Sequence, residues 1–213
     1  MKDNVFFVSG IDTNVGKSYA TGYLAKTWNE QGVRTITQKF IQTGNVGMSE
    51  DIELHRKIMG TGLLPEDESG LTMPEIFTYP CSPHLAAEID HRPIDFDKIE
   101  KATRQLSEPY DAVLLEGAGG LMVPLTRDLL TIDYVVQKNY PLIFVTSGKL
   151  GSINHTLLSL EAVTRRGIRL HTVAYNLFPE EDDDIIRRDT EAYIRDLLAK
   201  EYPETHFVIV PKL

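Results

Sequence analysis

The sequence is poor in cysteine and has no long apolar run. Cys81 is the one cysteine among 213 residues, which excludes an intramolecular disulfide and a zinc site built from several cysteines. Such a chain suits a reducing cytoplasm. Its first residues run directly into a predicted strand and leave no room for a signal peptide, and no stretch is long enough to span a bilayer. We therefore expect a cytoplasmic protein with no membrane partner.

Positive charge is also scarce. The chain has 22 Lys and Arg against 31 Asp and Glu, a formal net charge of −9, which argues against non-specific nucleic-acid binding. Hydrophobic residues make up 42% of the chain and charged residues 25%, as in ordinary globular proteins. A length of 213 residues is that of one domain with a full core. Residues 1–213 are therefore predicted to form a single domain.

Residues 4–18 contain the most informative pattern in the sequence. An apolar run rich in Val and Phe predicts a buried strand that stops at Gly10, and a helix is predicted to follow Gly16-Lys17-Ser18. Such a glycine-flanked loop cradles nucleotide phosphates with its backbone N–H groups and the helix N-terminus. Lys17 is expected to reach the β- and γ-phosphates and the Ser18 hydroxyl to ligate Mg²⁺. Because the loop has one residue more than the standard spacing, it is either a variant phosphate cradle or a structural glycine turn.

Predicted strands and helices alternate along the rest of the chain. The apolar patterns predict helices over residues 18–31, 49–59, 95–106, 152–166 and 183–200, and strands over residues 35–40, 112–116, 141–146, 170–175 and 207–210. Residues 60–93 are rich in Gly and Pro and are predicted to be mostly loop, and the acidic run at 180–184 is interpreted as a solvated helix start. This order predicts an α/β fold, a mostly parallel sheet with helices on both faces, similar to P-loop NTPases. Ligands of such sheets bind beyond the carboxyl ends of the strands.

Two predicted strand ends have side chains suited to a nucleotide. Lys39 ends the second strand, where a lysine can stabilise negative charge near the phosphates or be an ordinary surface residue. Asn176 follows the strand at 170–175. Its amide complements the N6/N7 edge of adenine, although Asn is also a common turn residue.

Two carboxylates are placed to hold a metal ion. Glu116 ends an apolar strand and is followed by a glycine-rich segment. In a phosphate-loop protein such a carboxylate supports the metal. The alternative interpretation is a carboxylate that caps a helix or stabilises a turn. Asp51 begins the helix after the Lys39 turn, where an acidic residue also complements the helix dipole. With Ser18, the two carboxylates predict a Mg²⁺ site made of hard oxygen ligands.

Taken together, these motifs resemble the dethiobiotin synthetase family. The resemblance rests on the loop Gly10 to Ser18 with its extra residue, Lys39 to Gly44, Ser49 to Asp51, Ser82 to His84, Glu116 to Gly120 with Pro124-Leu125, and Gly148 to His155. These segments span nearly the whole chain in the family's order. The resemblance implies an ATP-dependent ring closure in which 7,8-diaminononanoate, CO₂ and ATP give dethiobiotin, ADP and phosphate by way of a carbamate and a carbamic-phosphoric anhydride.

The resemblance also implies roles for individual residues. Lys17 and Lys39 are the expected catalytic residues, and Ser18, Asp51 and Glu116 are the expected Mg²⁺ ligands. The candidate substrate residues are Thr13, Thr43, Gly151 and Asn154, the last two near the partner subunit of an expected homodimer. The candidate ATP-binding residues are Asn14, Val15, Gly16, Lys17, Ser18, Tyr19, Asp51, Glu116, Gly117, Ala118, Gly119, Asn176 and Leu177.

The sequence departs from the family's pattern in three places. Phe40 stands where Pro is frequent, and Leu177 stands where a polar residue is common. The chain stops at Leu213, where many relatives continue into a segment that covers the base. The last departure predicts a weaker preference for ATP over CTP and GTP than in longer relatives.

Two other functions compete with this interpretation. Partner-regulated ATPases of the partitioning and septum-site class are similar in fold, but they have a further lysine early in the phosphate loop, where this chain has Ile11 and Asp12. An amidotransferase module needs a glutaminase domain with a nucleophilic cysteine, and neither the chain length nor the surroundings of Cys81 provide one. The dethiobiotin synthetase interpretation is therefore favoured over both.

Overall fold

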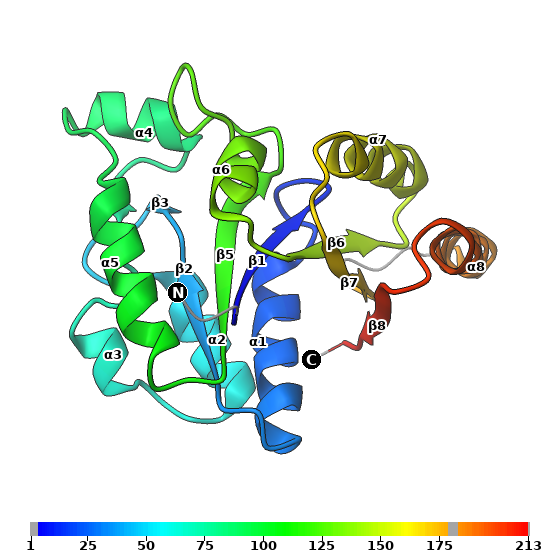
Figure 1. Cartoon of the computed structure of the whole chain (residues 1–213), viewed down its shortest axis with the longest axis horizontal. Coiled ribbons are helices and arrows are strands. Elements are labelled where there is room, and N and C mark those ends of the chain that lie inside the picture. Colours follow the sequence, from blue (N-terminus) through cyan, green and yellow to red (C-terminus); the bar gives the residue numbers. More distant parts are fainter. Residues whose placement is uncertain (1–3, 179–182, 213) are drawn as a thin grey trace.

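The computed structural model of the chain describes residues 4–178 and 183–212. The strands are β1 (Val5–Gly10), β2 (Thr35–Lys39), β3 (Gln42–Thr43), β4 (Ile76–Phe77), β5 (Ala112–Gly120), β6 (Leu142–Ser147), β7 (Leu170–Asn176) and β8 (His206–Val210). The helices are α1 (Lys17–Glu30), α2 (Glu50–Met59), α3 (Pro65–Glu68), α4 (Pro83–Ile89), α5 (Phe96–Ser107), α6 (Thr131–Lys138), α7 (Ser152–Arg165) and α8 (Asp184–Glu201) (Figure 1). Residues 180–182 of the acidic run lie outside the described residues, and Asp183 caps α8.

Six strands form one parallel sheet in the order β2-β5-β1-β6-β7-β8. The chain moves from β1 to one edge of the sheet at β2, whereas β6, β7 and β8 extend it on the other side (Figure 1). Strand order therefore reverses around β1, which is where open α/β sheets place their ligands. The predicted α/β class and the predicted strands are confirmed.

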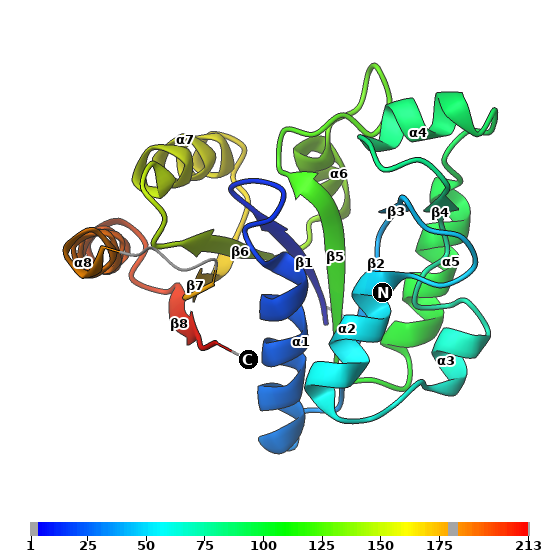
Figure 2. The ribbon, with the colours of Figure 1, turned by 180° about the vertical axis from the view of Figure 1, so that it is seen from behind.

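The sheet is buried on both faces. In β5, Val113 and Leu115 belong to an apolar cluster that includes residues of α5, α6, α7 and α8, whereas Leu114 belongs to a second cluster with residues of α1. Figure 2 shows α1 and α2 over this second face, where α2 packs against both α1 and β2. Strands that are buried on both faces have continuous apolar sequences. The carboxyl ends of the strands are therefore the accessible part of the sheet.

The structure corrects the prediction in two segments. The segment at 60–93, expected to be mostly loop, contains α3, α4 and the short strand β4, which pairs with β3 in a separate two-stranded sheet. The sequence also predicted no element at 131–138, where α6 forms. These helices have only 4, 7 and 8 residues, too few turns to show a clear period. In α6 tertiary packing decides, because Ile132 and Val135 are fully buried.

A further correction concerns the end of β5. The strand was expected to end at Glu116, but it continues to Gly120 because Gly10 of β1 pairs with Gly120 in the parallel ladder. Glu116 therefore lies inside β5, where its backbone pairs with Val8 of β1 on one side and with Lys39 of β2 on the other.

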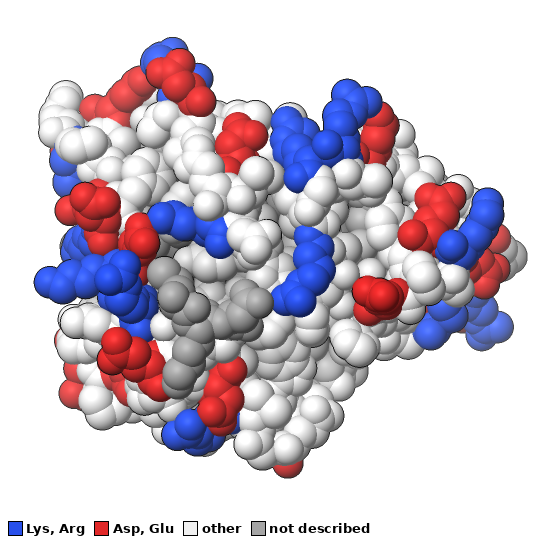
Figure 3. Space-filling model, viewed as in Figure 1, with Lys and Arg blue, Asp and Glu red and all other residues white. Residues whose placement is uncertain are grey.

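The surface shows no large segregation of charge on the face drawn in Figure 3, where acidic and basic side chains lie interspersed. Within residues 4–178 and 183–212, no helix combines the length and the apolar character that a membrane crossing requires.

Candidate active site

The loop between β1 and α1 is fixed around Gly16. This residue precedes α1 with φ of +85°, a conformation that favours glycine. A Cβ atom at Gly16 would lie 1.9 Å from Nδ2 of Asn176. The same Nδ2 donates a hydrogen bond of 2.9 Å to the carbonyl of Val15. The end of β7 thus anchors the loop, and the N-terminus of α1 presents unpaired backbone N–H groups to an anion.

The side chain of Lys17 lies along this loop. Its Nζ donates a hydrogen bond of 2.8 Å to the carbonyl oxygen of Asp12, and the residue is only 7% exposed. Burial, followed by the nearby charge of Lys39, lowers the pKa of Lys17 to about 8. An anion that arrives beside Lys17 therefore meets a poorly solvated ammonium group, for which a phosphate is a suitable partner.

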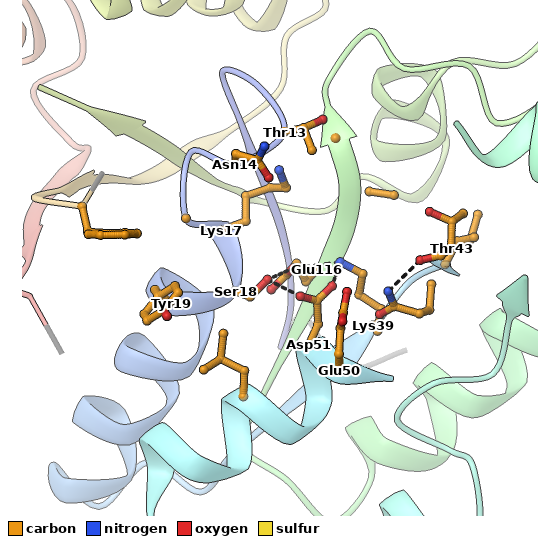
Figure 4. A pocket seen from close by; sticks show the side chains of 17 residues that line it. Thr13, Asn14, Lys17, Ser18, Tyr19, Lys39, Thr43, Glu50, Asp51 and Glu116 are labelled. Atoms are coloured by element: carbon orange, nitrogen blue, oxygen red, sulfur yellow. Dashed lines mark hydrogen bonds and ion pairs between the residues drawn. The ribbon is translucent and has the colours of Figure 1, made fainter. Parts of the chain in front are cut away.

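Two carboxylates, a hydroxyl and a lysine meet at the carboxyl edge of the sheet (Figure 4). The Ser18 hydroxyl donates to Oδ1 of Asp51 at 2.6 Å and lies 2.9 Å from Oε1 of Glu116. Nζ of Lys39 lies 2.5 Å from Oδ2 of Asp51 and 2.8 Å from Oε1 of Glu116. Asp51 comes from the first turn of α2, which begins at the capping residue Ser49. Four different elements (α1, α2, β2 and β5) therefore supply one polar cluster.

Lys39 and Glu116 form a buried ion pair at the centre of this cluster. Burial opposes both charges, but the carboxylates of Glu116 and Asp51 outweigh it and raise the pKa of Lys39 above its usual value. Burial likewise opposes the charge of Glu116, yet Lys39 and a hydrogen bond from His55 hold the pKa of Glu116 well below its usual range. Both groups are therefore charged at neutral pH. One ammonium faces two carboxylates, so a further cation beside them is favourable.

The oxygen atoms of Ser18, Asp51 and Glu116 fit a Mg²⁺ ion. All three are hard ligands, and they approach one another to within hydrogen-bonding distance. Within the described residues, no group of three or more His, Cys, Asp or Glu side chains is arranged to hold a metal by itself. Two carboxylates and a hydroxyl are enough protein ligands for Mg²⁺, because this ion takes one or two carboxylates and fills its other positions with phosphate oxygens and water.

Comparison with known proteins identifies the family. A family model described as an AAA domain matches residues 4–213. The chain is 52% identical over 206 residues to the ATP-dependent dethiobiotin synthetase BioD 2 of Pasteurella multocida, covering 97% of this chain and 96% of that protein. The chain belongs to the dethiobiotin synthetase family. The ATP-dependent dethiobiotin synthetase BioD of Chlorobaculum tepidum is also 52% identical, over 191 residues that cover 90% of this chain and 80% of that protein. The family and the enzyme class predicted from the sequence are confirmed.

Two solved structures of other families resemble the fold of this dethiobiotin synthetase. The structure of pNOB8 ParA bound to nonspecific DNA has a TM-score of 0.57 at 12% identity, with 99% of this chain and 85% of that chain covered. The structure of chloroplast FtsY from Physcomitrella patens has a TM-score of 0.53 at 15% identity, with 100% of this chain and 60% of that chain covered. Likeness at such identities shows the fold alone, so the ATPase alternative gains no support from it.

Most of the predicted site residues of the synthetase line one cavity of about 550 Å³. It lies between the phosphate loop and the cluster around Asp51 (Figure 4). The predicted residues in its lining are Thr13, Asn14, Gly16, Lys17, Ser18, Tyr19, Lys39, Thr43, Asp51, Glu116, Ala118 and Gly119. The sheet edge thus brings together residues that are far apart in the chain, as the strand-end rule requires.

Four other predicted ATP-binding residues lie outside this lining. Val15 lines a smaller cavity on the other side of the loop, and the carbonyl of Gly117 accepts a hydrogen bond from Lys39 at 3.3 Å. Asn176 is fully buried: it holds the loop, and its Oδ1 accepts from the backbone N–H of Phe178 at 3.2 Å. Leu177 is half-buried against the core. The roles of these four toward ATP stay predictions.

The two residues expected near a partner subunit lie at the start of α7. Gly151 precedes the helix with φ of +94°, and Asn154 is in its first turn; both are exposed. Neither is part of the lining of the main cavity or of the smaller one beside it. Their role toward the substrate near a partner subunit stays a prediction.

The structure adds residues that the sequence did not indicate. The lining also includes Ile41, Gln42, Glu50, Leu54 and Phe178. Among them, Phe178 lies near Tyr19, with ring centroids 5.9 Å apart. Phe178 follows a strand end by only two residues, so the strand-end rule is the signal that points to this segment. The side chain of His55, within the helix predicted over residues 49–59, contacts Glu116 from behind.

Proposed function

We propose that this chain converts 7,8-diaminononanoate, CO₂ and ATP to dethiobiotin, ADP and phosphate, with Mg²⁺ as its cofactor and as a cytoplasmic homodimer. Membership of the family supports the overall reaction. The observation that supports the mechanism is the position of Lys39, whose Nζ lies between two carboxylates at the wall of the cavity.

The reaction forms two C–N bonds to the carbon of CO₂. One amine of the substrate adds to CO₂, losing a proton, to give a carbamate. A carbamate oxygen then attacks the γ-phosphorus of ATP; the bond from this phosphorus to the bridging oxygen breaks, and ADP leaves. The second amine attacks the carbonyl carbon of the resulting anhydride and loses a proton, phosphate departs, and the ureido ring closes. Each step needs reactants held in line and negative charge offset.

Two lysines of this chain supply that charge. Lys17 binds the phosphates from the loop, beside the N-terminus of α1. Lys39 faces the same cavity from the end of β2 and stabilises the carbamate and the transferred phosphoryl group. Because both are largely buried, their charges act with less solvent screening than exposed lysines do.

The metal ligands of the proposal are Ser18, Asp51 and Glu116. When bound there, Mg²⁺ neutralises phosphate charge and helps to orient the phosphates. Ser18 is well placed to reach both the phosphates and the metal, because it stands in the first turn of α1, directly after Lys17. Lys39 contacts both of these carboxylates at the cavity wall, so its ammonium would stand beside a bound metal ion and the substrate.

Substrate contacts are proposed on both sides of the cavity. Thr13 in the loop and Thr43 in β3 line it and offer hydroxyl groups to the diamine. In the proposed dimer, Gly151 and Asn154 lie near the carboxylate tail of a substrate held by the partner subunit. Their exposure at the start of α7 supports this proposal.

Diamine-dependent turnover tests the proposed reaction. ADP release is measured with diaminononanoate, bicarbonate, ATP and Mg²⁺ and compared with the same mixture without the diamine. We expect release only with the diamine, together with formation of dethiobiotin. Release at the same rate without the diamine would contradict the proposal and favour a switch ATPase.

Replacement of Lys39 by Ala tests the proposed mechanism. We expect kcat to fall by about 10²- to 10³-fold, the usual effect of removing one group that stabilises developing charge, while the affinity for ADP remains. Lys26→Ala is the matched control, because Lys26 is an exposed lysine of α1 outside the cavity lining. An unchanged kcat in Lys39→Ala would show that Lys39 has no part in the chemistry.

A further inference from the structure

A second set of polar side chains is enclosed behind the metal cluster, between α2 and β2. Thr37, His55 and Arg56 are each at most 2% exposed. Nε2 of His55 lies 2.9 Å from Oε2 of Glu116, and Nδ1 of His55 lies 3.1 Å from Oγ1 of Thr37. Nη1 of Arg56 donates to the same Oγ1 at 2.9 Å. None of these three residues lines the cavity, and His55 connects them to the site through Glu116.

Nε2 of His55 carries a proton, because the ionised carboxylate of Glu116 can only accept a hydrogen bond. A guanidinium group can only donate, so Oγ1 of Thr37 accepts from Arg56. The same Oγ1 contacts Nδ1 of His55 and holds the ring on the side away from Glu116. Arg56 is itself fixed by Asp67, whose two carboxylate oxygens each lie 2.8 Å from a guanidinium nitrogen.

We propose that His55 is a positioning residue for Glu116, an inference that rests on the metal role proposed for this carboxylate. His55 holds Oε2 from behind, so that Oε1 stays directed at Ser18 and Lys39. Buried polar groups cost free energy unless they are paired, and an apolar layer of equal volume is commonly at least as stable. The polar layer is therefore explained by the orientation it gives to Glu116, and not by stability.

Two substitutions of His55 separate orientation from simple packing. The amide nitrogen of Gln reaches about where Nε2 stands, and that of Asn about where Nδ1 stands. His55→Gln thus keeps the bond to Glu116, whereas His55→Asn keeps only the side facing Thr37. Binding of Mn²⁺ in the presence of saturating ADP is measured from the electron paramagnetic resonance signal of free Mn²⁺. We expect His55→Asn to weaken Mn²⁺ binding by about 10- to 100-fold, as for other groups that orient metal ligands, and His55→Gln to bind like the parent chain.

Binding of ADP without metal is the control, because a general loss of structure weakens it and a misplaced Glu116 does not. Equal Mn²⁺ affinity in the two variants, whether retained or lost, would overturn the inference. If the parent chain with ADP binds no Mn²⁺, the metal role proposed for Glu116 is itself wrong.

A second pair covers the case in which the His55 variants do not fold. Thr37→Ser keeps the hydroxyl that contacts Nδ1 of His55, and Thr37→Val removes it at nearly constant volume. We expect weaker Mn²⁺ binding only in Thr37→Val, and equal affinities in this pair would likewise overturn the inference.

Discussion

The lowered pKa of Lys17 predicts that nucleotide affinity and protein stability change in opposite directions with pH. Phosphate groups bind the ammonium form of this lysine. With a pKa of about 8, roughly nine in ten chains carry the charge at pH 7 and about one in ten at pH 9. The dissociation constant for ADP, measured without metal, is therefore expected to rise about tenfold between these two pH values.

The free energy of unfolding of the free chain changes in the opposite direction to its ADP affinity as pH rises. The pKa of Lys17 falls from the ordinary lysine value of 10.5 in the unfolded chain to about 8 in the fold, so between these values the unfolded chain binds more protons. Stability is therefore lowered by the full cost of the buried charge below pH 8 and recovers as pH rises toward 10.5. The difference of 2.5 units corresponds to about 3 kcal/mol at most.

The assay is isothermal titration with ADP at intervals from pH 7 to pH 9, paired with urea unfolding of the free protein. Lys17→Arg is the matched control, because a guanidinium group keeps its charge throughout this range. Titration of ADP and of other lysines and tyrosines is common to both chains and cancels in the comparison. A flat ADP affinity in the parent chain, or the same slope in Lys17→Arg, would refute the assignment.

Two further substitutions test the supports of the site. In Gly16→Ala, the new Cβ atom would lie 1.9 Å from Nδ2 of Asn176 at a φ of +85°, so the loop must move. We expect ADP binding to be lost and the free energy of unfolding to fall by about 1–3 kcal/mol. Normal ADP titration would contradict this. In Asp67→Asn, the buried Arg56 loses its charged partner, so urea unfolding is expected to show a loss of about 3–5 kcal/mol; a loss well under 1 kcal/mol would show that Arg56 finds another partner.

The position of the cluster could be predicted from the sequence because the fold leaves it little freedom. Lys39 and Glu116 lie at the ends of two predicted strands, and in a parallel sheet such ends share one edge. The structure pairs them directly in the register of β2 and β5. The strand β5 is longer than predicted and continues past Glu116, but Glu116 still pairs with Lys39 in the ladder.

Contacts that cross between layers could not be predicted in the same way. Helical spacing predicted the helix at residues 49–59, but spacing does not say which residues a buried helix face contacts. The partner of His55 is Glu116, 61 residues further along the chain, and only the packing of α2 on β2 brings them together. The small helix α6 was missed for a related reason, because its four buried residues acquire their role from the sheet beneath them.

The alternation of polar and other residues in β2 is a pattern from which burial is predicted wrongly. Thr35, Thr37 and Lys39 are polar at every second position of a strand at the sheet edge, a pattern that ordinarily indicates a solvent-exposed face. All three are buried instead, because α1 and α2 both pack against this strand. Thr37 is paired by His55 and Arg56 of α2. The backbone of Thr35 pairs with Asn29 of α1, and Lys39 pairs with Asp51. A buried layer of this kind needs every donor and acceptor matched, which apolar packing does not. Its presence next to Glu116 is therefore better explained by the precision the carboxylate needs than by the stability of the fold.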